Sequence, residues 1–287
     1  MSTQELATIS AIDAWRRRTE EHHAQTIRAR AGRDVPDLWS GIADNFRADP
    51  RRADDPVVNL VSEWLRPDST VLDVGGGGGR YALPFALKSR EVTVVEPSPA
   101  MVSVLQQAAK EAGIENVRVV QQTWEEAQVE KHSVVFCANV VYGVAEIESF
   151  VRKLESAASD IVAIVAYYDA PLSMMSPLWE AVHEEKRINL PAFPELLSVL
   201  WEMEIYPNVN TLPGAARQTA PTLEMAIQFA RHFLYVEPGS EKDKRLEQVA
   251  REVAVQTPEG RWTIRPAQTR PQACVWWRTA DSPRGSG

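Results

Sequence analysis

Five consecutive glycines, Gly75 to Gly79, constrain this 287-residue chain more than any other feature. They directly follow a short apolar run at 70–74 and precede a segment of helical character at 81–87. Five adjacent glycines lose much conformational entropy on folding, so a purely structural turn would rarely use so many. Between a strand and a helix, a glycine loop lets the backbone approach a ligand closely and points helix N–H groups at it. The run therefore predicts a binding site for a nucleotide-like ligand.

Short apolar strands alternate with helical segments on both sides of this loop. Alternation of this kind indicates βαβ units and a parallel sheet, which places the chain in the α/β class. Asp55-Pro56 and Ser98-Pro99 predict helix starts, and Gly113 predicts a helix end. The strands are expected at 70–74, 91–96, 117–121, 133–138 and 160–168, and the helices at 55–66, 81–87, 98–112 and 147–154.

The spacing changes after residue 168, and this change predicts the domain organisation. Two helices are expected within 176–202, a sixth strand at 203–211 and a last strand at 273–278. The stretch between these two strands is too long for a tight turn, so it is interpreted as a helical insertion over one end of the sheet. The predicted parts are a helical N-terminal extension (1–54), a core (55–211), the helical lid insertion (212–271), the last core strand (272–280) and a disordered tail (281–287).

Composition excludes several classes of protein. Hydrophobic residues make up 44% and charged residues 24% of the chain, as in ordinary globular proteins. A formal net charge of −8 disfavours broad binding to nucleic-acid phosphates. The two cysteines, Cys137 and Cys274, lie in apolar runs and have no metal-ligand spacing, so buried thiols and no metal are expected. Neither a signal peptide nor a membrane span is visible, which predicts a cytoplasmic protein without a membrane partner.

Acidic residues beside the glycines narrow the kind of ligand. Asp73 precedes the run, and Glu96 closes the next strand, where a carboxylate can accept hydrogen bonds from both ribose hydroxyls of an adenosyl group. A dinucleotide fingerprint G-x-G-x-x-G fails in two registers of the run. It survives only in the weaker form Gly77, Gly79, Ala82, which keeps a nicotinamide cofactor open as an alternative.

These motifs resemble the class I, Rossmann-like S-adenosylmethionine-dependent methyltransferase family over about residues 35–170. Residues 71–79 look like the first motif of that family, and residues 96–101 look like the acidic residue of the second strand and the turn behind it. The resemblance implies a seven-stranded, mostly parallel sheet with helices on both faces and an antiparallel last strand. It also implies S-adenosyl-L-methionine as cofactor, with S-adenosyl-L-homocysteine as product. The residues that it assigns to cofactor contacts are Asp73, Gly75, Gly77, Glu96, Pro97 and Met101.

The segments expected at the adenine end of the cofactor and over the cofactor match the family pattern less closely than the glycine loop does. The segment 119–125 is similar to the next family segment, but Gln122-Thr123 stands where many members have Gly-Asp. Thr123 and Trp124 are therefore candidates for the adenine side, and Trp124 could equally belong to the core. Residues 39–46, ending at Phe46, resemble the segment that folds over the cofactor in this family; a helix packed on the domain is the alternative.

The end of the fourth predicted strand carries the candidate catalytic residues. Asn139 and Tyr142 have the spacing of the N-P-P-Y motif of amino-methyltransferases, although both prolines are missing. Asn139 is also a candidate cofactor contact. Because a sulfonium is already a strong electrophile, alignment and exclusion of water are the main requirements, and a base is needed only for a protonated acceptor. His183, and more weakly His232, could supply that base; His22 and His23 rank below them.

The function that these residues favour is in-line methyl transfer to a small molecule. Many aromatic residues in the C-terminal third, among them Trp179, Phe193 and Trp201, could line an acceptor pocket or simply pack the insertion. Two alternatives remain. One is a methyltransferase acting on protein or RNA, with residues 1–34 as a recognition arm, and the other is a non-catalytic nucleotide-binding or NAD-dependent protein. The sequence leaves the acceptor atom and the oligomeric state open.

Overall fold

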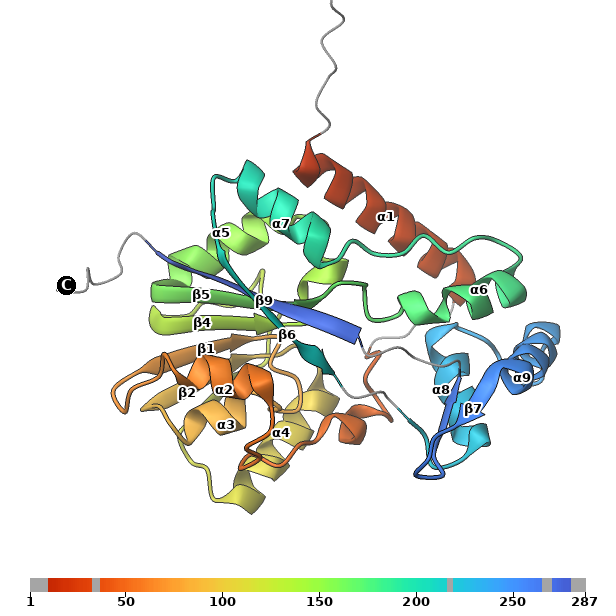
Figure 1. Cartoon of the computed structure of the whole chain (residues 1–287), viewed down its shortest axis with the longest axis horizontal. Helices are drawn as coiled ribbons and strands as arrows, with labels where there is room; N and C mark the ends of the chain where they lie inside the picture. Colours follow the sequence, from red (N-terminus) through yellow and green to blue (C-terminus); the bar gives the residue numbers. More distant parts are fainter. Residues whose placement is uncertain (1–9, 33–36, 216–218, 265–269, 280–287) are drawn as a thin grey trace, which may run out of the picture.

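A seven-stranded sheet forms the centre of the computed structural model, which describes residues 10–32, 37–215, 219–264 and 270–279 (Figure 1). Its strands are β1 (Thr70–Val74), β2 (Glu91–Val95), β3 (Val117–Val120), β4 (His132–Ala138), β5 (Ala158–Tyr167), β6 (Asn208–Ala215) and β9 (Arg270–Arg278). The strand order is β3-β2-β1-β4-β5-β9-β6. Only β9 runs against its neighbours β5 and β6, so the predicted sheet with its antiparallel last strand is confirmed.

Helices cover both faces of this sheet. The first face carries α2 (Pro56–Ser62), α3 (Ala82–Ala86) and α4 (Pro99–Ala112); the second carries α1 (Ala11–Arg30), α5 (Ile147–Ala157) and α7 (Phe193–Glu202). Successive strand residues point to opposite faces. In β4, for example, Val134 and Phe136 pack on the first face, and Val135 and Cys137 pack on the second. Both cysteine thiols are buried and free, as predicted.

The predicted helix signals act as expected around the glycine loop. The Asp55 side chain accepts hydrogen bonds from the backbone N–H groups of Val57 and Val58 at the start of α2. The Ser98 hydroxyl accepts from the Met101 N–H at the start of α4, and Gly113, at a φ of 66°, ends that helix. Such caps satisfy backbone groups that a helix end leaves without partners. They fix where α4 begins relative to β2.

Three predicted boundaries in the C-terminal part of the chain were wrong. The sixth strand begins at Asn208 and not at 203, because α7 runs to Glu202 and is closed by a turn in which Ile205 N–H bonds Leu200 O. Glu204 takes a left-handed φ of 62° in this turn, which directs the chain away from the helix. The insertion therefore starts after residue 215, and the last strand begins at Arg270 rather than 272. The predicted tail at 281–287 lies outside the described residues.

The lid insertion is not entirely helical. It contains α8 (Leu223–Phe233) and α9 (Glu241–Val253), followed by an antiparallel hairpin of β7 (Ala254–Gln256) and β8 (Trp262–Ile264). Together with α6 (Ser176–His183), these helices enclose a separate apolar cluster around Leu178, Trp179 and Leu246, at the right of Figure 1. The N-terminal extension is likewise only partly helical, because α1 is followed by turns and the short 3-10 helix η1 (Ala43–Phe46).

Most aromatic residues of the C-terminal third pack within the fold. Trp179, Phe193 and Phe233 are buried, and Trp276 and Trp277 pack on opposite faces of β9. In contrast, Trp201 and Tyr206 are 54% and 76% exposed on the outside. These side chains therefore do not gather around one pocket. None of the described helices has the length and apolar character needed to cross a membrane.

Candidate functional site

The glycine loop after β1 is tightly enclosed on its protein side. A Cβ atom on Gly75, whose φ is 70°, would lie 2.4 Å from Val140 Cγ2. A Cβ atom on Gly76 would lie 2.7 Å from Val94 and 2.9 Å from an oxygen of Asp73. In contrast, a Cβ on Gly77 would meet only the Met101 sulfur, at 3.8 Å. The loop can therefore accommodate only glycine at its first two positions, and it is open at Gly77.

Asp73 places a carboxyl group directly beneath this loop. The residue is 1% exposed, and its Oδ2 atom has no hydrogen-bond partner among the described residues. Burial, followed by the nearby charge of Glu96, raises the pKa of Asp73 to about 7, although the backbone N–H of Ala82 bonds the carboxylate and opposes this change. A buried oxygen without a partner is costly. Its position suits a ligand that brings a positive charge or an N–H donor.

Glu96 links the glycine loop to the turn after β2. Its Oε2 atom accepts a hydrogen bond of 2.9 Å from Gly77 N–H, and its Oε1 atom accepts one of 2.9 Å from Ser98 N–H. Burial raises the pKa of Glu96, and the two backbone hydrogen bonds lower it less. Each carboxylate oxygen can accept a further bond, so Glu96 can still receive the hydroxyl groups of a ribose. Pro97, which follows it, is exposed.

A third carboxylate comes from the N-terminal extension. Asp37 accepts hydrogen bonds of 2.8 and 3.0 Å from the Ser98 hydroxyl and one of 3.4 Å from Ala100 N–H. Its charge contributes to the raised pKa of Glu96. Within the part of the chain that the structure describes, no Lys or Arg pairs with Asp37, Asp73 or Glu96. The three carboxylates thus form an acidic cluster at the glycine loop, here called the acidic floor, which favours a cationic ligand over an anionic one.

The predicted cover segment follows Asp37 and packs on α4. Trp39 and Phe46 pack edge to face, with ring centres 5.1 Å apart, against Met101 and Val104 of α4. The Phe46 carbonyl oxygen lies 3.8 Å from the position of a Cβ on Gly78. At its other end the segment is tied to the lid, because Leu38 O accepts a hydrogen bond from His232 Nε2 at 2.8 Å. His232 therefore ties the cover to the lid through its Nε2 atom.

The two candidates for the adenine side have structural partners. Trp124 is buried in the main core beside Phe150 and donates its indole N–H to Phe150 O at 3.3 Å. Thr123 starts the next turn: its hydroxyl bonds Glu126, and its carbonyl accepts from Ala127 N–H. Thr123 is half-buried and is therefore closer to solvent than Trp124. Trp124 is buried in the core, in agreement with the alternative that it is a core residue.

The end of β4 brings Asn139 next to the glycine loop. Asn139 takes a φ of 62°, a left-handed conformation that asparagine tolerates better than most residues. The Tyr142 hydroxyl donates a hydrogen bond of 2.9 Å to Asn139 Oδ1 and accepts one of 2.7 Å from Tyr167 N–H. Since Tyr142 is 3% exposed, its ring is not available for stacking on an acceptor. It positions Asn139, which is half-buried.

Replacing Tyr142 by phenylalanine is expected to loosen the end of β4. The Y142F variant leaves the Tyr167 N–H and Asn139 Oδ1 without their partner, at a cost of about 1 to 2 kcal/mol in the free energy of unfolding. Urea denaturation of both proteins measures this loss. The reverse result, unchanged stability, would mean that the Tyr142 hydroxyl does not hold this loop.

His183, the predicted base, ends α6 and contacts the lid insertion. Its Nε2 bonds Leu234 O at 2.9 Å, its Nδ1 faces Lys242 Nζ at 3.1 Å, and its ring stacks on Trp179 at 4.1 Å. Because a carbonyl only accepts and an ammonium only donates, the ring is neutral with its proton on Nε2. Burial lowers its pKa accordingly. His183 therefore has no free nitrogen to receive a substrate proton in this structure.

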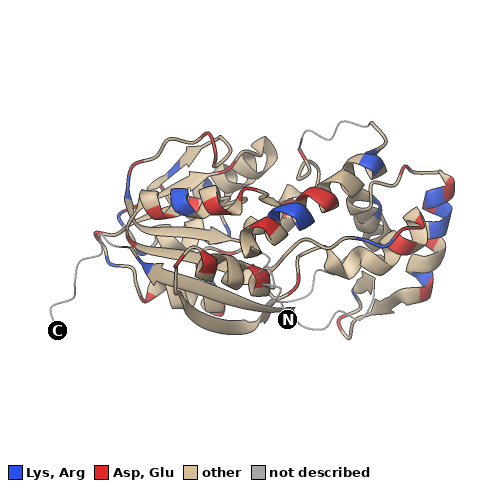
Figure 2. Cartoon of the chain, turned by 90° about the horizontal axis from the view of Figure 1, so that it is seen from above, with Lys and Arg blue, Asp and Glu red and all other residues tan. Residues whose placement is uncertain are grey.

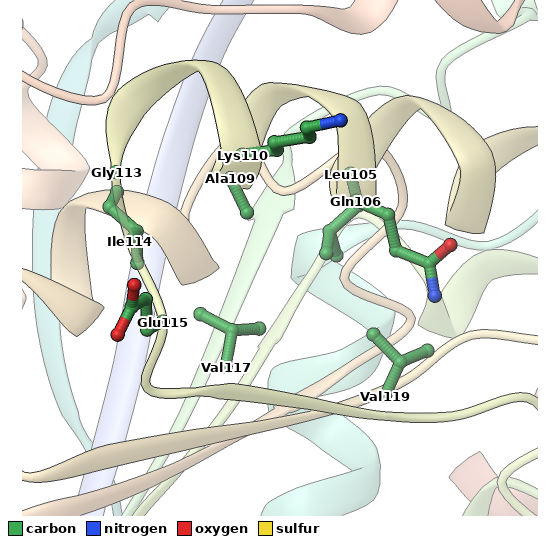
Figure 3. Close-up of a pocket in the computed structure, with 9 residues that line it drawn as sticks. All are labelled: Leu105, Gln106, Ala109, Lys110, Gly113, Ile114, Glu115, Val117 and Val119. Carbon is green, nitrogen blue, oxygen red and sulfur yellow. The ribbon is translucent and has the colours of Figure 1, made fainter.

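A separate groove of about 440 Å³ lies between α4 and the edge strand β3 (Figure 3). Leu105, Ala109 and Val117 form part of its apolar lining, with Gln106, Lys110 and Glu115 around them. It shares no residue with the glycine loop, with Glu96 or with the end of β4. This groove is not where the predicted chemistry gathers.

Two residues at the site were not predicted from the sequence. Asp37 stands apart from every motif, and Val140, which fills the space beside Gly75, looks like any apolar strand residue. Neither has a local signal, because both act through contacts with residues more than 60 positions away.

In the view of Figure 2, acidic and basic residues are mixed along the helices and form no continuous basic stripe among the described residues.

Comparison with known proteins agrees with this geometry. Residues 71–159 match the model of a methyltransferase domain. A "Ubiquinone biosynthesis O-methyltransferase" of Rickettsia felis is 35% identical over 85 residues, which is 29% of this chain and 34% of that protein. The "Uncharacterized methyltransferase YcgJ" of Bacillus subtilis is 32% identical over 91 residues, or 31% of this chain and 36% of that protein. The chain thus spans about a third of the length of these curated relatives.

Solved structures show the same fold over a greater length. The alignment with the structure of YcgJ from Bacillus subtilis spans 77% of this chain and 97% of the YcgJ chain, with 15% identity and a TM-score of 0.50. The alignment with the structure of a "putative methyltransferase" from Bacillus halodurans spans 79% of this chain and 99% of that chain, with 15% identity and a TM-score of 0.54. The region that matches the methyltransferase-domain model, 71–159, contains the glycine loop, Glu96 and the end of β4.

Proposed function

Because residues 71–159 make this chain a member of the class I S-adenosylmethionine-dependent methyltransferase family, we propose that it transfers the methyl group of S-adenosylmethionine to a small-molecule acceptor. Binding of this cofactor and of S-adenosylhomocysteine is typical of the family. When bound, the cofactor supplies an electrophilic methyl group on a positively charged sulfur. The protein then has to hold it, align the acceptor and exclude water.

The observation that carries the proposal is the acidic floor of Asp73, Glu96 and Asp37, which no Lys or Arg of the described chain neutralises. S-adenosylmethionine carries an ammonium group and a sulfonium, both of which this floor attracts. A dinucleotide carries a pyrophosphate, which the same carboxylates repel. The electrostatics therefore favour the methyl donor over the NAD alternative that one register of the glycine run leaves open.

The residues present suit the cofactor in a simple way. Asp73 Oδ2 has a vacant acceptor position for the amino group, Glu96 can accept from the ribose, and Gly77 offers the open side of the loop. Met101, Phe46 and Trp39 supply the apolar cover. We assign Asn139, which Tyr142 holds, to the acceptor side, where its amide would orient the acceptor.

A small acceptor is supported by the relatives and by the lid. The relatives include an enzyme named for O-methylation in ubiquinone biosynthesis. The cover is tied to the lid through His232 and Leu38, and to α4 through Asp37. A cover held at both ends suits a small acceptor, because it can exclude water during transfer.

Isothermal titration with S-adenosylmethionine, S-adenosylhomocysteine and NADH tests the cofactor. We expect both sulfur ligands to bind, with Kd values between about 1 μM and 1 mM as is common for enzyme substrates, and NADH not to bind. Binding of NADH alone would overturn the proposal. Incubation with methyl-tritiated cofactor and 3,4-dihydroxybenzoate, phenethylamine or total RNA tests the acceptor class; label in RNA alone would favour a macromolecular acceptor.

A further inference from the structure

His23 lies where α1 crosses the loop that follows β4. The Trp15 indole N–H donates to Val144 O at 2.7 Å, and Arg16 pairs with Glu146 at 2.9 Å, so these contacts anchor α1 to this loop. About two turns further along α1, His23 Nε2 lies 3.6 Å from the position of a Cβ on Gly143. The path of α1 along the second face, from α7 towards α6, is visible in Figure 1.

A short series of contacts connects this imidazole to the cofactor loop. A Cβ on Gly75 would meet Val140, so the glycine loop touches the residue just after β4. Asn139 precedes Val140 and is held by Tyr142, and Gly143 follows Tyr142 directly in the 3-10 helix η2 (Val141–Gly143). His23 therefore stands beside the same loop that presents Asn139. Gly143 has no side chain to separate this loop from the ring.

The ring of His23 is available in a way that other histidines are not. It is half-buried, and neither of its nitrogens has a hydrogen-bond partner within the described residues. Its neighbour His22, in contrast, bonds Ile188 O at 2.6 Å and the Arg187 guanidinium at 2.7 Å. His132, His183 and His232 also have partners for at least one ring nitrogen.

The charges around His23 keep its ring neutral. Burial lowers its pKa most, and the positive charges of Arg187 and Arg30 lower it further. Glu20, one turn earlier on α1, opposes them. His22 adds no positive charge, because burial and Arg187 lower its pKa to about 4. The 3-10 helix η2, on the other side of the ring, carries no charged side chain. A neutral imidazole at pH 7 has a lone pair that can accept a proton.

We propose that His23 is the general base of the transfer, although the sequence ranked it, with His22, below His183 and His232; this rests on the methyl-transfer function proposed above. The acceptor belongs to the class with an O–H or N–H at the reacting atom, such as a phenol. Its proton moves to His23 Nε2 while its electron pair forms the new bond to the methyl carbon. The electron pair of the broken carbon–sulfur bond stays on sulfur, which leaves a neutral thioether and a protonated imidazole.

The test measures how a positive charge on the bound ligand changes the pKa of His23, so it does not need the natural acceptor. Sinefungin carries an amino group where S-adenosylmethionine carries its methyl group, whereas S-adenosylhomocysteine carries nothing there. We would record histidine side-chain NMR spectra of the full chain across pH in each complex, and assign His23 by the signal that H23Q lacks. An ammonium near the ring is expected to lower the pKa of His23 by about one unit relative to the S-adenosylhomocysteine complex, a tenfold change in proton affinity.

His132 and His183 are internal controls, because their ring partners lie in the core and in the lid; their titrations should not differ between the complexes. H23Q should bind S-adenosylhomocysteine within about twofold of the wild type. An identical His23 titration in the two complexes, or a ring that is protonated at pH 7.5, would overturn the assignment while leaving methyl transfer intact. Failure of both ligands to bind would instead overturn the proposed function, and this inference with it.

Discussion

Gly75→Ala is expected to destabilise the protein and to weaken cofactor binding more than any other single-methyl change in the core. The new Cβ would lie 2.4 Å from Val140 Cγ2 at a backbone φ of 70°. The steric overlap and the left-handed backbone together should cost about 2 to 4 kcal/mol. Because relief of the overlap moves the glycine loop, the affinity for S-adenosylhomocysteine should fall at least about tenfold. Urea denaturation and isothermal titration measure the two effects.

Gly113→Ala is the matched control for this variant. Gly113 has nearly the same φ, 66°, but a Cβ there meets no atom within 4 Å. It should lose only about 1 to 2 kcal/mol and retain cofactor affinity. The double variant G75A with V140A should recover part of the lost stability, because the Val140 side chain is the obstacle. Equal losses in G75A and G113A would show that Val140 does not press on the loop.

Asp73→Asn is expected to separate stability from cofactor binding. Burial raises the pKa of Asp73 to about 7 from the ordinary value of 3.8. Between these values the folded state binds a proton that the unfolded state has lost, so the free energy of unfolding falls as pH rises through this window. The difference corresponds to about 4 kcal/mol. D73N lacks this slope and should therefore gain stability relative to the wild type as pH rises from 4 to 8.

The same variant should lose affinity for S-adenosylmethionine. In the wild type the affinity should increase as pH rises towards 7, since only the ionised carboxylate attracts the cation, and D73N should show no such increase. D243N provides the contrast: Asp243 is also buried but pairs with Arg231 at 2.7 Å, so its loss should destabilise the protein at pH 8. Thermal unfolding and titration at pH 5, 6, 7 and 8 measure both. Wild-type affinity in D73N would remove Asp73 from the site.

The sequence by itself determined the order of elements and the cofactor loop. Strand 70–74, the helix start at Ser98-Pro99 and its end at Gly113 agree with the structure, because each depends on local patterns of apolar, capping and glycine residues. The positions of Asp73 and Glu96 could be predicted for the same reason: Asp73 lies near the carboxyl end of β1 and Glu96 directly follows β2, and these ends meet at one edge of a parallel sheet. The boundaries of β6 and the hairpin of β7 and β8 could not, since the closing turn of α7 and strand pairing depend on tertiary contacts.

Only the tertiary structure decided which polar residues are free to act. His183 and Tyr142 looked available in the sequence, but their hydrogen-bonding atoms are occupied by Leu234, Lys242, Asn139 and Tyr167. Asp37 and His23 lie far from every motif, yet the fold places one on Ser98 and the other beside Gly143. Whether a side chain is free depends on partners that are distant in sequence. The glycine run therefore predicts where the candidate site lies, and the packing of α1 and the cover around it identifies which candidate residues have free polar atoms.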